Sequence, residues 1–286
     1  MDTTISLEQT NPRLGDVATN LADHLERIER ARKDGAGLVA FPELSLTGYF
    51  LKDQVVDLGM ELDAAPLAQL AEASKGISIA VGFVERSDDG QLYNAYGLFE
   101  EGELRACHRK VHLVSYGLFD EGRDFAAGDR FVAWESRVGR IVPLICEDFW
   151  HVPSTYLYFL ADVDLLLVAS ASPARGVAAT YEGLGSVHTW NALLRAAALW
   201  SRTWVAYAGR VGWEDGIGFA GASAVFDPEG DLVEQLGGLA PGRLRVAIDR
   251  ASLHRARIST PLRRDEKPWI LARAMEAHDA KQRAEL

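Results

Sequence analysis

Three side chains suited to hydrolytic chemistry each follow an apolar run of the sequence, far apart along the chain. Cys146, one of two cysteines, ends the run in "PLICEDFW", Glu43 ends the run in "LVAFPELS", and Lys110 lies just beyond another run in "CHRKVHL". A carboxylate can take the proton of a thiol, and a fixed cation can stabilise the oxyanion that forms when the sulfur attacks an amide carbonyl. If these segments meet, the sequence predicts a site for amide hydrolysis.

Cys146 also has a plainer interpretation, because cysteine is among the most often buried residue types. The segment that follows it, "EDFWHVPST", is typical of a tight turn into a helix. We therefore expect the sulfur at the carboxyl edge of a sheet, facing backbone N–H groups and the amino end of a helix, which favour a thiolate. Taken singly, Glu43 and Lys110 would be a loop carboxylate and a surface charge, so the prediction depends on the three together.

The elements that must position these residues alternate between strands and helices. Asp16 can cap a helix whose apolar residues Val17, Leu21, Leu25 and Ile28 form one stripe. In the first half we further expect strands at 38–41 and 77–84, a helix at 64–74 and a hairpin of 95–99 with 104–108. In the second half we expect strands at 140–146, 164–170 and 204–209, helices at 154–161 and 186–201, and a hairpin of 223–226 with 232–235. This order predicts an α/β protein in which two sheets pack face to face with helices outside, a four-layer α-β-β-α sandwich.

Composition and linkers set the remaining limits. The chain has 286 residues and a formal net charge of -11, which argues against a broad nucleic-acid surface and favours a small-molecule partner. Polar residues interrupt any signal peptide near Met1, and no run reaches the roughly 20 apolar residues of a membrane span, so we expect a soluble cytoplasmic protein without a membrane partner. Because no flexible linker separates the halves, we expect one domain over residues 1–286. Its charged tail, residues 250–286, either packs on a partner subunit or is solvated.

The three segments, with those that connect them, resemble the nitrilase superfamily of carbon-nitrogen hydrolases over nearly the whole chain. "FPELSLTGY", "HRKVHL" and "LICEDFW" match its catalytic segments, and "YGLFDEGRDFAAG" matches the segment with a second glutamate, here Glu121. "QTNPRLGDVATN" and "FAGASAVFDPEGDLV" are similar to its opening segment and late hairpin. Within the superfamily the sequence is most similar to the glutaminase domain of glutamine-dependent NAD synthetases. It shows no phosphate loop of the synthetase kind, so we expect no NAD synthesis by this chain.

The resemblance implies a Glu-Lys-Cys triad in an α-β-β-α sandwich. In it Glu43 would take the proton of Cys146, and Lys110 with the backbone N–H of Glu147 would hold the oxyanion. The substrate would pass through a thioester, with release of ammonia or an amine, and Glu121 would orient Lys110 or the substrate. The resemblance also implies a homo-oligomer, a dimer or a larger assembly, and it implies no cofactor.

The segment "SASPARG" is the expected substrate-binding segment, and it departs from the related domains, which tend to have "NASP" there. Ser170 takes the place of the Asn. Ser172 and Arg175 are candidates to bind a polar or carboxylate group, and Tyr116 and Glu147 are candidates to line the pocket. An amidase of the glutaminase type is therefore the preferred interpretation. An N-carbamoyl amino acid hydrolase, a nitrilase and a catalytically idle binding or regulatory subunit stay open.

Two other groups of residues have weaker claims. A metal site could be built from Cys107, His108, His112 and His151, but their spacing fits no common zinc pattern and we expect no metal. In the helix expected at 186–201, His188 and Trp190 could border the pocket, although we favour helix packing for both.

Overall fold

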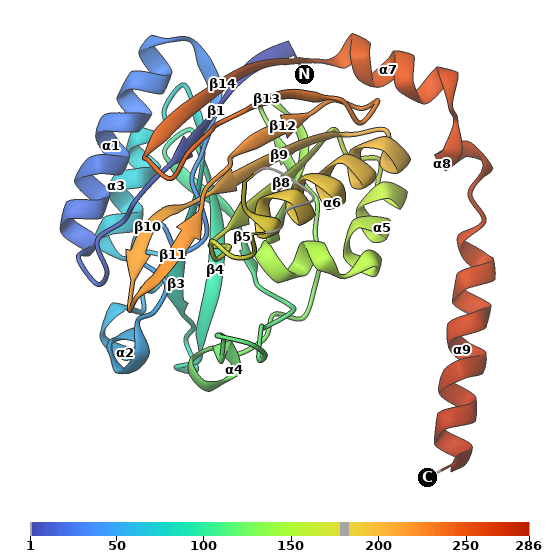
Figure 1. The fold of residues 1–286 in the computed structure, drawn as a ribbon, viewed down its shortest axis with the longest axis horizontal. Helices are drawn as coiled ribbons and strands as arrows, with labels where there is room; N and C mark the ends of the chain where they lie inside the picture. The colour runs from blue at the N-terminus through green and yellow to red at the C-terminus, as the bar shows by residue number, and fades with distance from the viewer. Residues whose placement is uncertain (1, 178–182, 286) are drawn as a thin grey trace.

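A computed structural model describes residues 2–177 and 183–285 of the chain. Two six-stranded sheets form its centre (Figure 1). The first sheet has the order β14-β1-β2-β3-β4-β5, with β1 Asp2–Gln9, β2 Ala36–Ala40, β3 Ser78–Arg86, β4 Leu92–Glu100, β5 Glu103–Arg109 and β14 Gly242–Asp249. The second has the order β13-β12-β9-β8-β7-β6, with β6 Trp134–Ser136, β7 Gly139–Ile145, β8 Leu165–Ser170, β9 Trp204–Gly209, β12 Ala224–Phe226 and β13 Leu232–Gln235.

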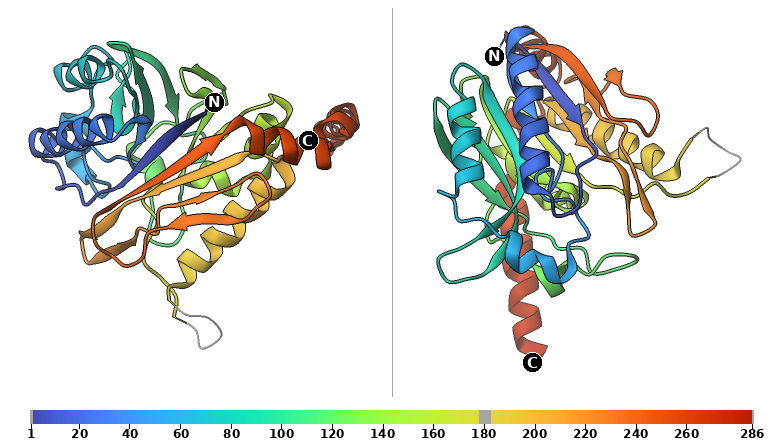
Figure 2. Two further views of the ribbon diagram at one scale, coloured as in Figure 1. Left: turned by 90° about the horizontal axis from the view of Figure 1, so that it is seen from above. Right: turned by 90° about the vertical axis from the view of Figure 1, so that its left-hand side faces the viewer.

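Two helices cover the outer face of each sheet. They are α1 Val17–Lys33 and α3 Ala65–Ala73 on the first sheet, and α5 Val152–Leu160 and α6 Gly185–Ser201 on the second. Figure 2 shows the sheets face to face between these helix layers. The four-layer α-β-β-α sandwich predicted from the sequence is therefore confirmed. Shorter elements lie in the connections: η1 Lys52–Gln54, α2 Val55–Leu58, α4 Glu121–Asp124, η2 Cys146–Trp150, and the hairpin of β10 Val211–Glu214 with β11 Ile217–Ala220.

The alternation of side chains along each strand builds the layers. On β2, Leu38 and Ala40 point into the core between the sheets, while Val39 and the following Phe41 pack with the helices outside. The expected helix cap is also present, since Asp16 Oδ1 accepts a hydrogen bond from Thr19 N at 3.0 Å. The apolar pattern of the sequence thus fixes both the faces of the strands and the start of α1.

Strands β1, β6, β10, β11 and β14 were not predicted. β1 and β14 pair antiparallel at the edge of the first sheet, and β10 and β11 form a separate hairpin. In β1 the apolar Ile5 and Leu7 alternate with the polar Ser6 and Glu8, which is the two-residue period of a strand. Both polar side chains are buried, and Ser6 Oγ donates to Glu8 Oε1 at 2.9 Å. The alternation was therefore a strand signal that the prediction did not use, and the structure adds that the polar face is buried as well.

The C-terminal segment is helical. It contains α7 Arg250–Ser259, α8 Leu262–Asp265 and α9 Pro268–Glu285. α7 packs on the body through the buried Leu253 and Ala256, whereas α9 stands away from it (Figure 1). The choice between solvated tail and subunit contact therefore concerns α9. None of the helices within the described residues is both long and apolar enough to cross a membrane.

Candidate functional site

The carboxyl ends of the core strands bring two of the predicted residues into direct contact. β2, β3 and β5 run in one direction, so their carboxyl ends share one edge of the first sheet. Glu43 lies three residues beyond β2 and Lys110 directly follows β5. Lys110 Nζ donates to Glu43 Oε1 at 2.7 Å, and both side chains are buried. Residues 67 positions apart in the sequence therefore form one buried ion pair at this edge.

Cys146 lies at the corresponding edge of the second sheet, where β7 ends at Ile145. It adopts φ 43° and opens the short helix η2. Positive φ is uncommon for a residue with a side chain and is found at functional turns, because it redirects the side chain away from the strand. Ser170, which ends the neighbouring strand β8, donates its hydroxyl to Cys146 Sγ at 3.2 Å. The sulfur packs against both the core between the sheets and the core beneath α5 and α6.

Lys110 is held between two carboxylates. Besides Glu43, it donates to Glu121 Oε1 at 2.6 Å, and the other Glu121 oxygen accepts from Val114 N at 2.9 Å. Burial alone would lower the pKa of Lys110, but the carboxylates of Glu121 and Glu43 hold that pKa well above its ordinary value. Lys110 is therefore a permanent cation in a dry site.

Glu43 is held by further donors. Its Oε1 atom accepts from Asn94 Nδ2 at 2.8 Å, and its Oε2 atom accepts from the backbone N–H of Ala171 at 2.8 Å. Burial raises the pKa of Glu43 above its ordinary value; Lys110 opposes this shift and Glu121 adds to it. A buried carboxylate with a raised pKa is suited to accept and return a proton near neutral pH.

The thiol of Cys146 differs from the sequence-based prediction of a thiolate. Burial, reinforced by the charge of Glu43, raises the pKa of Cys146, while Lys110 and the Ser170 hydroxyl oppose the rise. The turn after the sulfur is a five-residue 3-10 helix, and α5 starts only at Val152, beyond that turn. The resting thiol therefore keeps its proton, and the sulfur needs a neighbouring base.

The expected substrate-binding residues fall in different places. Tyr116 is 62% exposed and donates its hydroxyl to the buried Glu147 carboxylate at 3.0 Å. Ser170 adjoins the sulfur, as described above. Ser172 is turned to the helix layer, since its hydroxyl accepts from Trp190 Nε1 at 2.9 Å. Arg175 is exposed and lies beside Gly117, next to Tyr116. Ser170 thus adjoins the sulfur, Tyr116 binds the side chain of Glu147, which directly follows Cys146, and Arg175 lies on the surface beside them.

His188 and Trp190 have separate surroundings on α6. Trp190 is buried and stacks on Phe149 and Tyr207, which is the helix packing that we expected. His188 is exposed near the start of the same helix.

Asp148, to which no role was assigned from the sequence, holds the nearby histidines in place. It accepts from His108 Nε2 at 2.9 Å and from the backbone N–H groups of Val111 and His112 at 3.0 and 2.9 Å. His151 stacks on the ring of His112 at 3.7 Å. These contacts tie the segment after Lys110 to the turn after the cysteine. The signal that could have found Asp148 is an acid two residues after the thiol in an apolar segment.

Cys107, the fourth member of the metal set considered above, is part of another cluster, because its sulfur faces Glu85 at 3.7 Å. In the described ranges, 2–177 and 183–285, no group of three or more His, Cys, Asp or Glu side chains is placed to hold a metal ion.

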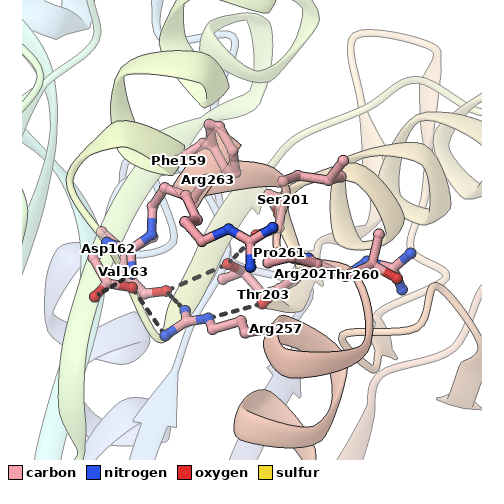
Figure 3. Close-up of a pocket in the computed structure, with 12 residues that line it drawn as sticks. Phe159, Asp162, Val163, Ser201, Arg202, Thr203, Arg257, Thr260, Pro261 and Arg263 are labelled. Atoms are coloured by element: carbon pink, nitrogen blue, oxygen red, sulfur yellow. Dashed lines mark hydrogen bonds and ion pairs between the residues drawn. The ribbon is translucent and has the colours of Figure 1, made fainter. Parts of the chain in front are cut away.

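A cavity of about 340 Å³ lies elsewhere, between the ends of α5 and α6 and the segment α7–α8 (Figure 3). Arg257 and Arg263 both pair with Asp162, at 2.9 and 2.8 Å. Arg257 also donates to the backbone carbonyls of Val163 and Arg202. None of the site residues predicted from the sequence lines this cavity, and its charges fasten the C-terminal segment to the body.

Known proteins share sequence and fold with this chain. Residues 4–258 match the family model described as Carbon-nitrogen hydrolase. A glutamine-dependent NAD(+) synthetase of Thermotoga maritima is 30% identical over 239 residues, which are 80% of this chain and 39% of the synthetase. The chain thus spans about two fifths of that relative. A protein of Pseudomonas protegens described as "Hydrolase in pqqF 5'region" is 31% identical over 271 residues, 93% of this chain and 90% of the relative.

Among solved structures, a mutant of the amidase from Nesterenkonia sp. AN1 is 26% identical, with a TM-score of 0.75. The match covers 88% of this chain and 95% of the amidase. That structure is described as showing covalent addition of the acetamide moiety of fluoroacetamide at the active-site cysteine of the amidase.

Proposed function

The chain belongs to the carbon-nitrogen hydrolase family, and we propose that it hydrolyses the amide bond of a small molecule through a thioester on Cys146. The observation that carries the proposal is the buried pair of Glu43 and Lys110, 2.7 Å apart, at the sheet edge that adjoins the Cys146 turn. Such a set supplies a base, a cation and a nucleophile in one water-poor site.

In the first half of the reaction, Glu43 takes the proton of Cys146 as the sulfur attacks the carbonyl carbon. The carbonyl oxygen becomes an oxyanion. An ammonium group has three N–H donors, and two of those on Lys110 go to Glu43 and Glu121. The third donates to the oxyanion together with the backbone N–H of Glu147. The protonated Glu43 then gives its proton to the amide nitrogen, the carbon-nitrogen bond breaks, and ammonia or an amine leaves.

The second half returns the enzyme to its starting state. Glu43, again ionised, takes a proton from water as the water oxygen attacks the thioester carbon. The carbon-sulfur bond of the second tetrahedral intermediate breaks, the carboxylic acid is released, and the sulfur regains the proton from Glu43. The raised pKa of Glu43 suits both directions of transfer, because it makes the carboxylate a stronger base than an ordinary glutamate.

For the substrate we propose a primary ω-amide of an amino acid, such as glutamine. Two charges of opposite sign lie on either side of Tyr116: the Glu147 carboxylate, which accepts from the Tyr116 hydroxyl and follows Cys146 in the chain, and the Arg175 guanidinium, beside Gly117. These match the α-ammonium and α-carboxylate groups of an amino acid. The similarity to glutamine-dependent synthetases supports the same substrate class.

An ammonia-release panel tests the proposal. Wild-type protein and Cys146→Ala are compared on glutamine, asparagine, ω-amides of dicarboxylic acids, N-carbamoyl amino acids and simple nitriles. We expect release from glutamine or another ω-amide by the wild type and none by the variant. Release from nitriles or carbamoyl compounds alone would replace the amidase assignment. No release from any compound would favour a binding or regulatory protein.

A further inference from the structure

A buried ion pair that the mechanism does not use, Arg210 with Glu214, lies next to the strand end that carries Ser170. Arg210 follows β9, in the same row of strand ends as Cys146 and Ser170, and its backbone N–H donates to Ser170 O at 3.0 Å. Its side chain is 1% exposed and its guanidinium lies 4.0 Å from the centre of the Phe219 ring. The guanidinium pairs with Glu214 Oε1 at 2.5 Å. A guanidinium in such a place requires its carboxylate partner, because an unpaired buried charge is strongly destabilising.

Glu214 connects this pair to the loop that follows Glu43. Its second oxygen, Oε2, accepts from the backbone N–H groups of Tyr49 and Phe50, each at 3.0 Å. The loop approaches so closely that a Cβ atom added to Gly48 would lie 2.8 Å from Glu214 Oε1. A carboxylate can bind two N–H groups and a guanidinium at once, which an apolar side chain of the same size cannot do.

Tyr49 carries the connection to the catalytic cation. Its hydroxyl donates to Glu121 Oε1, the same oxygen that binds Lys110 Nζ at 2.6 Å. A continuous series of hydrogen bonds therefore runs from Arg210 through Glu214, the backbone and hydroxyl of Tyr49, and Glu121 to Lys110. The pair Arg210–Glu214 touches none of the groups that react in the proposed mechanism.

We propose that Arg210 and Glu214 are positioning residues, which fix Tyr49 so that Glu121 holds Lys110 where the oxyanion forms. The inference rests on the proposed function in that Lys110 is the oxyanion donor. It predicts that loss of the Glu214 carboxylate acts on the transition state through the same contacts as loss of the Tyr49 hydroxyl.

A double-mutant cycle tests this series of contacts from Arg210 to Lys110, which we call the relay. Glu214→Gln, Tyr49→Phe and the double variant are compared with wild type in kcat and KM for ammonia release. We expect each single change to lower kcat about tenfold or more with KM changed less than threefold, since positioning acts on the transition state. The double variant should lose no more than the larger single loss, because both changes break one series of contacts. Losses that multiply would overturn the relay, as would a Glu214→Gln variant with unchanged kcat.

Two controls separate positioning from stability. Glu100→Gln removes another buried carboxylate that accepts a backbone N–H, from Arg137 at 3.1 Å, at the opposite end of the first sheet. It should keep kcat. Arg210→Lys keeps the charge, and we expect it to fold and to lose less kcat than Glu214→Gln. If Glu214→Gln does not fold, Arg210→Lys takes its place in the cycle, and a kcat equal to wild type there would overturn the relay.

The rate at which iodoacetamide alkylates Cys146 tests the relay in the absence of a substrate. Lys110 lowers the pKa of the thiol, so a displaced Lys110 should slow alkylation at a given pH in both single variants, and not further in the double. A wild type that hydrolyses no amide but shows this pattern would refute the proposed function and leave the relay standing. An active enzyme with independent losses in kcat and in alkylation would refute the relay alone.

Discussion

The two cysteines have similar neighbours and different geometry. Cys107 lies within β5, with its sulfur 3.7 Å from the Glu85 carboxylate and with Arg109 two residues away. Cys146 has Glu43 and Lys110 as its charged neighbours. Burial is the main cause that raises the pKa of both thiols, and the nearby carboxylate adds to it in each case. A thiol with a carboxylate and a cation nearby therefore occurs twice in this chain.

The cation and the backbone make the difference. The guanidinium of Arg109 binds both oxygens of Glu85, at 2.9 and 2.5 Å, so its fork is matched to that carboxylate. The ammonium of Lys110 binds one oxygen from each of two carboxylates and has a third donor for a substrate oxygen. Cys146 also leaves its strand at positive φ, whereas Cys107 stays within one. The donor geometry and the turn therefore define the proposed site, and the residue types alone do not.

Replacement of the two thiols should give the largest contrast. We expect Cys146→Ala to lose activity by a factor on the order of 10⁵ to 10⁶ in kcat, because the nucleophile is absent. Cys107→Ala should stay within about twofold of wild type. Ammonia release, with circular dichroism to verify folding, measures both. A folded Cys146→Ala protein with wild-type activity would remove the distinction between the thiols.

Replacement of the carboxylates beside the two thiols should give the second-largest contrast in activity. Glu43→Gln should lose a factor of about 10² to 10⁴, because it removes the base, while Glu85→Gln should keep the mechanism. Only the ionised form of Glu43 can take a proton, and its pKa lies above the ordinary 4.5. Wild-type kcat/KM should therefore fall as the pH decreases, with a midpoint above 4.5. A kcat/KM that stays constant down to pH 4.5 would contradict the role of Glu43.

The turn that carries Cys146 should depend on Asp148 for stability. Replacing this buried carboxylate by Asp148→Asn should lower the free energy of unfolding by about 3 kcal/mol, since it breaks hydrogen bonds from His108 and two backbone N–H groups. The exposed Asp129→Asn should leave it nearly unchanged, because an ion pair in solvent contributes little to stability. Urea unfolding measures both. Equal stabilities would show that Asp148 does not hold the turn.

The same residue predicts a pH dependence of stability. Burial alone would raise the pKa of Asp148, but the hydrogen bonds from His108 and His112 hold it below the ordinary 3.8. Its stabilising effect is therefore complete above pH 3.8 and is lost as the pH falls below that value. Wild type should lose more stability on acidification than Asp148→Asn does, and parallel curves would contradict this assignment.

Alkylation should give the smallest contrast. Iodoacetamide should label Cys146 several-fold faster than Cys107. A cation opposes the rise in the pKa of each thiol, but the hydrogen bond from Ser170 also opposes it at Cys146, whereas the hydrogen bond to Glu85 adds to it at Cys107. Peptide mass spectrometry after short exposure measures the order. Faster labelling of Cys107 would mean that the two surroundings differ less than the geometry indicates.

Much of this arrangement follows from local patterns in the sequence. An apolar run that ends abruptly in a charged or reactive residue marks the end of a buried strand, which is why Glu43, Lys110 and Cys146 could be selected. The layers could be predicted because the periods of two and 3.6 residues are clear in most elements. The strand β1 shows the same period of two residues and was overlooked; its polar residues Ser6 and Glu8 are buried and hydrogen-bonded to each other.

The remaining features depend on contacts between distant segments. Glu214 binds the backbone of Tyr49 from 165 residues away, and no local pattern marks such a pair. The protonated state of Cys146 likewise follows from burial and from Glu43, whereas the sequence pointed only to the turn. Arg175 could be chosen for its charge, but only the fold places it beside Gly117, next to Tyr116.

Mass spectrometry of protein quenched with acid during turnover can detect the proposed thioester on Cys146. With the best amide of the panel, at times from the first turnover onward, we expect an acyl group on the peptide that contains Cys146 and none on the peptide that contains Cys107. Turnover with no acyl group on Cys146 at any quench time, or with the acyl group on Cys107, would contradict it.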